Sequence, residues 1–372
     1  MKIIVVHKSN LEKIPPVISA IDIMLELGYE IVLINTGVAK NLYDLFQQKG
    51  VEMYTISNKK SNIKLLKLID YINFRKRAFK IITQYSFTES ILLWIEGGPT
   101  ILCLGSKIKR YKYILQISEL HEKQNLLLRA MNKVIHQAAA VFIPEYNRTI
   151  LYKIWFKLEK KPLVLPNKPY FLPSIDDLSV IKSKYKDVIA LLENKKVILY
   201  QGGISKTRML DKIACITKEL GGEFRLLLVG AEQEKGVITE LKKIDPTIIH
   251  VDFIPAPDYL IFATIAYIGF VFYAPTSLNN AYCAPNKINE YSAYSLPMLG
   301  NDIPGLKYIF EKTNAGVIVD ETSLDSIREG ILKIDNNYSF YKSNAHKVYN
   351  CVDNKKVIKA ILDTIDYDTL TV

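Results

Sequence analysis

Two charged side chains in the second half of the chain have a spacing that suits joint binding of a ligand. Lys287 and Glu290 lie three residues apart in the segment CAPNKINEYSAYSLPMLGND, after an apolar run and a loop. Residues three apart are neighbours on a helix surface, so one interpretation is an exposed ion pair. The other is a site in which Lys287 contacts phosphate groups, Glu290 accepts hydrogen bonds from ribose hydroxyls, and Asn286 lies beside them.

A second candidate site is the segment YQGGISKTRMLDKI, where an apolar strand runs into Gly202 and Gly203 and then into a helix that begins near Arg208. Glycines let a ligand approach the backbone, and a helix N-terminus with a nearby cation attracts a diphosphate. The first half has a similar connection in WIEGGPT, at Gly97 and Gly98. Both connections can also be structural turns or plain helix starts.

Short apolar segments alternate with helical periodicity along the whole chain, and these segments predict the strands. In the first half the predicted strands are residues 3–7, 30–35, 53–57, 91–95, 113–117 and 141–144. In the second half they are residues 197–200, 225–229, 248–252, 269–273, 297–300 and 316–319. The alternation predicts an α/β fold of two Rossmann-like domains with parallel sheets.

A proline-rich segment, KKPLVLPNKPYFLPS, separates the two halves and is interpreted as the interdomain linker, because proline disfavours helices and central strands. The expected domains are residues 1–168, joined by a C-terminal helix at 353–372, and residues 169–352. Open parallel sheets bind ligands at the carboxyl ends of their strands. Two such sheets facing a central cleft would bind two substrates, which indicates group transfer.

The charge of the chain is unevenly distributed. The formal net charge is +11, and residues 51–200 hold 26 Lys and Arg against 12 Asp and Glu. No nucleic-acid-binding motif accompanies this excess, so an anionic membrane surface or a phosphorylated acceptor is favoured over nucleic acid, with an ordinary lysine-rich surface as the alternative. A helix predicted near residues 60–80 would carry much of the basic face, with Lys60, Lys64, Lys67, Tyr71 and Arg75 at three- and four-residue steps.

The four cysteines are scattered, without a C-x-x-C pair or nearby histidine ligands, so neither a zinc site nor a disulfide framework is expected. The first residues predict a buried strand rather than a signal peptide. These features predict a cytoplasmic protein, peripheral on the inner face of the cell membrane if the basic region binds lipid.

The second half resembles the retaining GT-B glycosyltransferases that include many capsule and lipopolysaccharide enzymes. Its segment APNKINEYSAYSLPMLGNDIPGL is similar to their P-x-K-x-x-E-Y-x-A-x-G-x-P, and VFIPEYNR with KPLVLPNKP is similar to the end of their first domain. The resemblance implies that Glu290 holds the nucleotide ribose and that Arg208 and Lys287 hold the diphosphate without a metal. The chain departs from the pattern at Tyr282, where a second glutamate is frequent, and at Gly203, where arginine is frequent.

The resemblance also implies a catalytic histidine or His–Glu pair in the segment QISELHEKQ, which corresponds here to Glu119 or His121. Gly97 and Gly98 are expected to face the acceptor. The glycine-rich loop that the family has after its first strand is absent, since His7 is followed by KSNLEKIPP.

The predicted activity is therefore a hexosyltransferase-like, metal-independent sugar transfer in surface polysaccharide biosynthesis. The donor would be a UDP or GDP sugar, with no other cofactor, and the acceptor a glycan or a polyprenyl-diphosphate-linked glycan. Retention at the anomeric carbon is expected. Two alternatives stay open: a nucleotide-sugar epimerase on the same fold, and a non-catalytic GT-B binding subunit.

Overall fold

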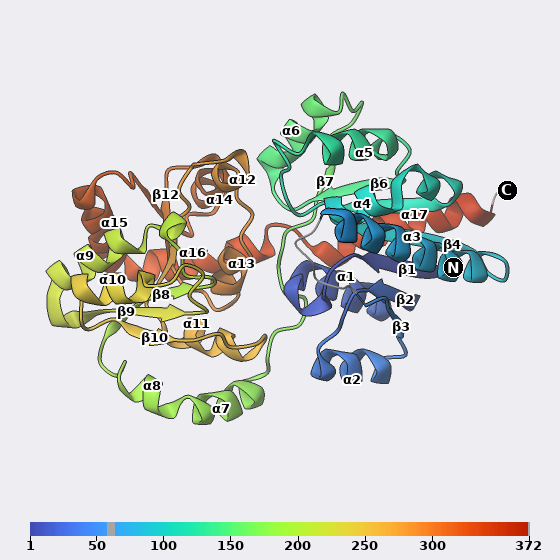
Figure 1. Cartoon of the computed structure of the whole chain (residues 1–372). Coiled ribbons are helices and arrows are strands. Elements are labelled where there is room, and N and C mark those ends of the chain that lie inside the picture. The colour runs from blue at the N-terminus through green and yellow to red at the C-terminus, as the bar shows by residue number, and fades with distance from the viewer. Residues whose placement is uncertain (58–63, 371–372) are drawn as a thin grey trace. The chain divides into compact units, whose positions relative to one another are not determined.

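The computed structural model describes residues 1–57 and 64–370 and divides into two compact units (Figure 1). The N-terminal unit comprises Met1–Tyr170 and Val352–Val372, and the C-terminal unit comprises Phe171–Cys351. The division between Tyr170 and Phe171 lies within the proline-rich segment.

The N-terminal unit is built on a seven-stranded parallel sheet in the order β3-β2-β1-β4-β5-β6-β7. Its strands are β1 Lys2–His7, β2 Glu30–Asn35, β3 Glu52–Thr55, β4 Ile91–Glu96, β5 Lys112–Gln116, β6 Ala140–Ile143 and β7 Leu163–Val164. The central strands are continuous apolar runs. In β1, for example, the four residues from Ile3 to Val6 are fully buried, as expected where helices cover both faces of a sheet.

The helices of this unit are η1 Leu11–Lys13, α1 Pro15–Glu26, α2 Lys40–Gln48, α3 Lys64–Ser86, α4 Gly98–Leu104, η2 Gly105–Arg110, α5 Asn125–Ile135, α6 Tyr146–Trp155 and α17 Asn354–Leu370. The last helix returns to the N-terminal core, where Ile358, Leu362 and Ile365 pack in one cluster with residues of β1 and α1. Residues far apart in the chain thus share one core.

The C-terminal unit has a six-stranded parallel sheet in the order β10-β9-β8-β11-β12-β13. Its strands are β8 Lys196–Gln201, β9 Phe224–Val229, β10 Ile249–Val251, β11 Ile268–Val271, β12 Met298–Asn301 and β13 Gly316–Val319. Its helices are α7 Ile175–Lys184, α8 Lys186–Ala190, η3 Lys206–Arg208, α9 Leu210–Leu220, η4 Gly221–Glu223, α10 Val237–Ile244, η5 Asp258–Leu260, α11 Ile261–Ile265, α12 Leu278–Ala281, α13 Asn286–Ala293, α14 Pro304–Thr313, α15 Leu324–Asn336 and α16 Tyr338–Asn350. Two apolar clusters, one on each face, fill its core.

The prediction of an α/β fold with two Rossmann-like parallel sheets is confirmed. Each sheet grows outward in both directions from its first strand, so the strand order reverses between β1 and β4 and again between β8 and β11. In open sheets of this kind, ligands bind outside the carboxyl ends of the strands at that point of reversal. Functional side chains are therefore expected at the carboxyl ends of β1 and β4 and of β8 and β11.

Two details differ from the sequence-based expectation. The segment predicted as a linker contains the short strand β7, which pairs with β6 at the sheet edge. An edge position tolerates the flanking prolines Pro162 and Pro166 because the outer side of such a strand needs no partner. In addition, several helices had no bounds predicted from the sequence, among them α2, α7, α10, α14 and α16. No helix among the described residues is both long and apolar enough to cross a membrane.

Candidate functional site

The carboxyl end of β8 begins the candidate site of the C-terminal unit. Gly202 follows the strand with a φ of 126°, a conformation that glycine adopts far more readily than other residues. The chain then passes through η3 and reaches α9 at Met209, whose φ is 50°. Gly203 leaves room for a neighbour, since a Cβ there would lie 2.0 Å from Nε2 of Gln233. This path places Arg208 at the last position of η3.

Lys287 is a buried cation held against aromatic rings. Its Nζ lies 3.8 Å from the centroid of the Tyr200 ring and 5.6 Å from that of Tyr273. It also lies beside the backbone at Gly202, 3.6 Å from where a Cβ of that residue would be. Burial lowers the pKa of the Lys287 ammonium well below its usual range, and the charge of Arg208 lowers it further.

Arg208 lies over the second of these rings, with its guanidinium carbon 4.0 Å from the Tyr273 centroid. Its Nη1 atom is buried and has no hydrogen-bond partner among the described residues. The arrangement is fixed by the backbone, because the Ala274 amide donates to the Thr207 carbonyl at 2.9 Å. Asn301 at the end of β12 holds Tyr273 as well, through hydrogen bonds to its N–H and its carbonyl.

Glu290 lies one helical turn after Lys287 on α13 and is 5% exposed. The Tyr259 hydroxyl donates a hydrogen bond of 2.5 Å to its Oε1. Burial raises the pKa of Glu290 to about 7, although the Tyr259 hydrogen bond and the charge of Lys287 oppose this rise. Both Lys287 and Glu290 are buried, so the exposed ion pair considered from the sequence is excluded. Asn286, the first residue of α13, is half-buried beside them in the chain.

Together these residues form a site whose charges are only partly balanced within the described protein. Two cations lie over one tyrosine ring, and a carboxyl that titrates near neutrality lies a turn away. Cation–π contacts offset only part of the cost of removing a charge from water. An anion that reached Arg208 and Lys287 would relieve this cost, while hydroxyl groups could donate to Glu290. The site therefore suits a ligand that combines phosphate with vicinal hydroxyls.

The N-terminal unit places a histidine–carboxylate pair at the equivalent point of its sheet. His7 ends β1 and Glu96 ends β4, and the two residues are register partners. His7 Nδ1 lies 2.5 Å from Glu96 Oε2, and the Ser118 hydroxyl donates to Glu96 Oε1 at 3.1 Å. Both members of the pair are buried. A carboxylate beside an imidazole nitrogen is an arrangement that acid–base sites use to orient the ring, so this pair has the groups needed to accept and pass on a proton.

His121 belongs to the same edge of the sheet, after β5. Its Nε2 packs against α4, lying 2.6 Å from where a Cβ of Gly98 would be, so this approach requires glycine. Burial lowers the pKa of His121, which keeps the imidazole neutral near pH 7. Gly97, with a φ of 83°, turns the chain into α4. The side chain of Glu119 is exposed, and its carbonyl accepts a hydrogen bond from the Tyr152 hydroxyl.

The structure thus brings Arg208, Lys287 and Glu290 together, and it places His121 beside Gly98. The His7–Glu96 pair was not predicted from the sequence, because the two residues are far apart in the chain and only strand register joins them. The available signal was that each is the last residue of an apolar strand. The site tyrosines Tyr200, Tyr259 and Tyr273 were not predicted either, because the sequence pattern does not distinguish them from core residues.

The basic face predicted for residues 60–80 is only partly present. Lys60 and the side chain of Lys64 lie outside the described residues. Arg75 was expected on the exposed basic face, but it is half-buried, with its guanidinium against Gly105. Apolar residues of the same helix are exposed as well: Leu68 is 57% exposed, and Ile69 and Ile72 are each 44% exposed. Exposed basic residues accompany them on α3, namely Lys67, Lys76, Arg77 and Lys80.

Among the described residues, no group of three or more His, Cys, Asp and Glu side chains is arranged to hold a metal ion.

No protein family profile and no curated protein sequence matches this chain. Solved structures match it in fold. HepE from Anabaena in complex with UDP is 13% identical, with a TM-score of 0.71 and 100% of both chains covered. A glycosyltransferase from Rickettsia africae ESF-5 is 15% identical, with a TM-score of 0.68 and coverage of 98% of this chain and 97% of that one. Sucrose-phosphate synthase from Thermosynechococcus elongatus is 12% identical, with a TM-score of 0.71 and 100% of both chains covered. The chain therefore has the two-domain α/β fold of the GT-B glycosyltransferases.

Proposed function

We propose that this protein is a glycosyltransferase that moves a sugar from a nucleotide-diphosphate donor to a glycan or lipid-linked acceptor. Residues 169–352 bind the donor, and residues 1–168 with 353–372 bind the acceptor. The observation that most supports this function is the buried Lys287 and the half-buried Arg208, which lie over the same tyrosine ring, with the Glu290 carboxyl one helical turn after Lys287. Of the proteins with the same fold, HepE has been crystallised with UDP and with UDP-glucose.

The donor is held by charge and by hydroxyl recognition. Arg208 and Lys287 contact the diphosphate, and ionised Glu290 accepts hydrogen bonds from the ribose hydroxyls. As the bond from the sugar to phosphate breaks, negative charge grows on the leaving nucleotide. Preorganised cations stabilise that charge more strongly in the transition state than in the ground state. These side chains supply the stabilisation that a metal ion provides elsewhere, so transfer is metal-independent.

The acceptor hydroxyl is positioned by the polar cluster of the N-terminal unit, which consists of His7, Glu96 and His121. Neutral His121 can accept its hydrogen bond, while the His7–Glu96 pair can hold the proton that the hydroxyl loses. Transfer proceeds with retention, as in the family that the second half of the sequence resembles. A role in surface polysaccharide biosynthesis and a cytoplasmic, peripheral location belong to the same proposal. The exposed apolar and basic side chains of α3 would face an anionic membrane surface.

The first test is a thermal-shift screen with UDP, GDP, ADP and CMP. A ligand that binds only the folded protein increases the free energy of unfolding, by about 2.7 kcal/mol at a ligand concentration of one hundred times Kd. The melting temperature rises as a result. UDP or GDP should produce this shift. Lys287→Met removes a buried charge, so it should fold normally and lose the shift. Lys186→Met, at an exposed position of the same unit, should keep it. Absence of a shift with all four nucleotides would refute the proposal.

The second test separates transfer from the two alternatives. The protein is incubated with UDP-glucose and related nucleotide sugars, with and without a glycan acceptor and EDTA. Transfer releases the nucleotide only with the acceptor, is unaffected by EDTA, and gives a product whose anomeric configuration is read by NMR. A new nucleotide sugar formed without the acceptor would indicate an epimerase. Binding without any turnover would indicate a non-catalytic subunit.

A further inference from the structure

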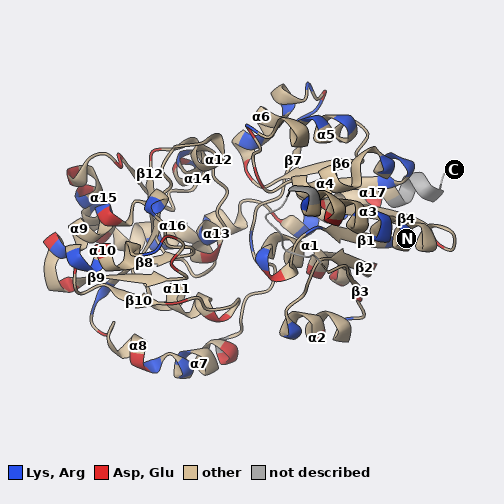
Figure 2. Cartoon of the chain, viewed as in Figure 1, with Lys and Arg blue, Asp and Glu red and all other residues tan. Residues whose placement is uncertain are grey.

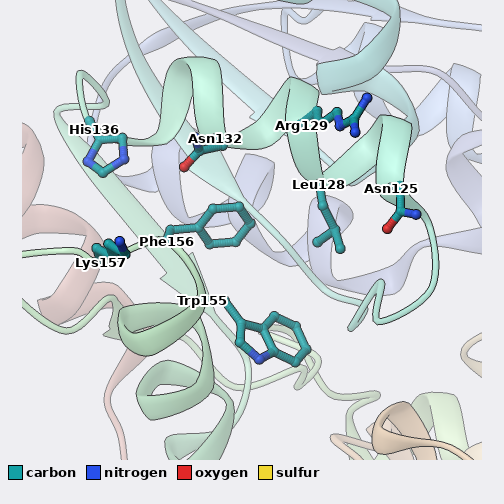
Figure 3. A pocket seen from close by; sticks show the side chains of 8 residues that line it. All are labelled: Asn125, Leu128, Arg129, Asn132, His136, Trp155, Phe156 and Lys157. Carbon is teal, nitrogen blue, oxygen red and sulfur yellow. The ribbon is translucent and has the colours of Figure 1, made fainter.

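A groove of about 610 Å³ lies between α5 and the end of α6 in the N-terminal unit. Eight described residues line it, five from one face of α5 and the residue after it, and three from the end of α6 (Figure 3). Small-molecule sites usually have volumes of this size. The residues of the groove have no role in the donor site or in the polar cluster described above.

The polar face of α5 forms one wall. Asn125, Arg129 and Asn132 follow one another at steps of four and three residues, so they lie on the same side of the helix. The opposite side is buried in the core through Leu127 and Met131. Asparagine amides both donate and accept hydrogen bonds, which suits a ligand rich in hydroxyl groups.

The end of α6 forms the other wall. The half-buried ring of Trp155 packs against the Tyr152 ring, with centroids 5.9 Å apart, so its orientation is set by the core. Lys157 follows with a φ of 51°, while the Leu158 amide closes the helix on the Lys153 carbonyl. Glycine usually occupies this left-handed position. Lysine here places a cation at the groove at the expense of backbone strain.

The charges of the groove lie at its two ends. Figure 3 shows Arg129 and Asn125 at one end, and His136 and Lys157 at the other, with Leu128 and Trp155 facing each other between them. None of the described lining residues is Asp or Glu. Lys and Arg also lie along the rest of α5 and α6 (Figure 2). Separated cations suit a ligand that carries repeated negative charges along its length, rather than a single phosphate group.

We propose that this groove binds an anionic oligosaccharide as an extended acceptor subsite, an inference that rests on the glycosyltransferase function proposed above. The indole face packs on the apolar face of a sugar ring, the amides bind hydroxyls, and Arg129 and Lys157 each bind a carboxylate or phosphate on separate sugar residues. The groove begins at Asn125, four residues after His121, and follows α5 for about 16 Å. A chain whose reacting end lies near His121 can therefore continue along it.

The test uses the two tryptophans of the chain. Trp94 is fully buried and donates to Gln116, so a saccharide should change mainly the emission of Trp155. The full-length protein, without nucleotide, is titrated with hyaluronan hexasaccharide, pentamannose phosphate and neutral maltohexaose. We expect at least one anionic saccharide to change the emission, and the better of the two identifies carboxylate or phosphate as the recognised group. Equal binding of maltohexaose, or binding of none, would overturn the proposal.

Variants distinguish specific binding in the groove from non-specific attraction to the basic surface of α5. Arg129→Gln and Lys157→Gln should each raise Kd by about tenfold, the usual effect of losing a charged hydrogen bond. Lys133→Gln is the matched control, because Lys133 is exposed on the same helix and does not line the groove. Lys157→Gly should weaken binding while raising the melting temperature, since it removes the backbone strain. An equal loss of affinity in Lys133→Gln would overturn the proposal.

A parallel UDP thermal shift keeps the two proposals separate. If UDP binds and neither anionic saccharide does, the groove assignment is wrong and the donor site stands. If a saccharide binds in the groove and no nucleotide binds, the groove stands as a saccharide site and the transferase function fails.

Discussion

The two units share one backbone plan and differ in what they place at the carboxyl ends of their central strands. In the N-terminal unit the strands themselves supply the polar groups, since His7 ends β1 and Glu96 ends β4. In the C-terminal unit the region after β8 and β11 supplies glycine and tyrosine, and the charges come from η3 and α13. Two parallel sheets of the same plan thus present different functional groups, through their last strand residues and the connections that follow them.

The difference between the units is one of charge balance. In the N-terminal unit, an imidazole nitrogen and a carboxylate oxygen of opposite potential charge lie 2.5 Å apart. In the C-terminal unit, Arg208 and Lys287 share a tyrosine ring, and Glu290 is hydrogen-bonded by a neutral hydroxyl. The first arrangement pairs an imidazole with a carboxyl and leaves the buried Nε2 of His7 without a hydrogen-bond partner among the described residues. The second gains most when an anion binds. Variants of the two units should therefore affect different measurable quantities.

The largest effect is expected from Arg208→Ala, which should lower turnover more than it weakens donor binding. A fixed cation stabilises the charge that develops on the leaving phosphate, and loss of one such group costs on the order of 3 kcal/mol, or about a hundredfold in kcat. Arg208→Lys should restore only part of the lost kcat, because lysine lacks the planar guanidinium that can donate two parallel hydrogen bonds. Steady-state kinetics decide this. A higher donor KM with unchanged kcat would mean that Arg208 only binds the ground state.

Glu290→Ala should weaken UDP binding by about 2 kcal/mol, or roughly thirtyfold, because hydrogen bonds to a charged group contribute on that order. Calorimetry at pH 8 measures the effect. Glu193→Ala provides the control, since Glu193 is an exposed carboxylate of the same unit. Equal affinity in Glu290→Ala and the parent protein would remove Glu290 from the donor site.

Glu96→Gln should lower kcat by about tenfold and leave the UDP dissociation constant unchanged. The amide keeps the shape of the side chain but removes the carboxylate that lies beside the His7 imidazole. Kinetics with a saccharide acceptor and calorimetry with UDP test the two parts separately. A loss of UDP affinity comparable to that of Glu290→Ala would contradict the division of roles between the units.

UDP affinity should fall as the pH decreases from 8 to 6. Only ionised Glu290 accepts two hydroxyl donors, and its pKa of about 7 means that the ionised fraction falls across this range. If only the ionised form binds UDP, the affinity should fall by about tenfold between pH 8 and pH 6, which is the largest effect expected. In Glu290→Gln this contribution should be absent, while protonation of the nucleotide itself affects both proteins equally. A ratio of the two dissociation constants that does not change with pH would contradict the assignment.

The smallest effect concerns α3 and anionic vesicles. Lys67→Gln and Arg77→Gln should each weaken vesicle binding by about 1 kcal/mol at low salt, because both side chains are exposed. Arg75→Gln should have little effect, since its guanidinium packs against Gly105. Co-sedimentation with phosphatidylserine vesicles measures this. Equal sedimentation of all variants would exclude α3 as a membrane-binding surface.

Local pattern was sufficient for much of the fold. Apolar runs such as Ile3 to Val6 predicted buried parallel strands, and a spacing of three placed Lys287 and Glu290 on one helix. The strand β7 was missed because two residues between prolines carry no periodicity. Patterns of this kind can be recognised in the sequence because the contacts that produce them join residues within one helical turn or one strand.

What the sequence by itself determined is the alternation of strands and helices and the identity of the charged residues after them. The tertiary structure decided which of those residues meet. His7 and Glu96 are joined by the register of β1 with β4. The ring of Tyr273, which follows β11, lies against the guanidinium of Arg208, which follows β8. Whether Lys287 and Glu290 are an exposed pair or a buried site also depended on packing, because burial is set by the surrounding elements. Burial is also the largest cause that moves the pKa values of both groups away from the ordinary range.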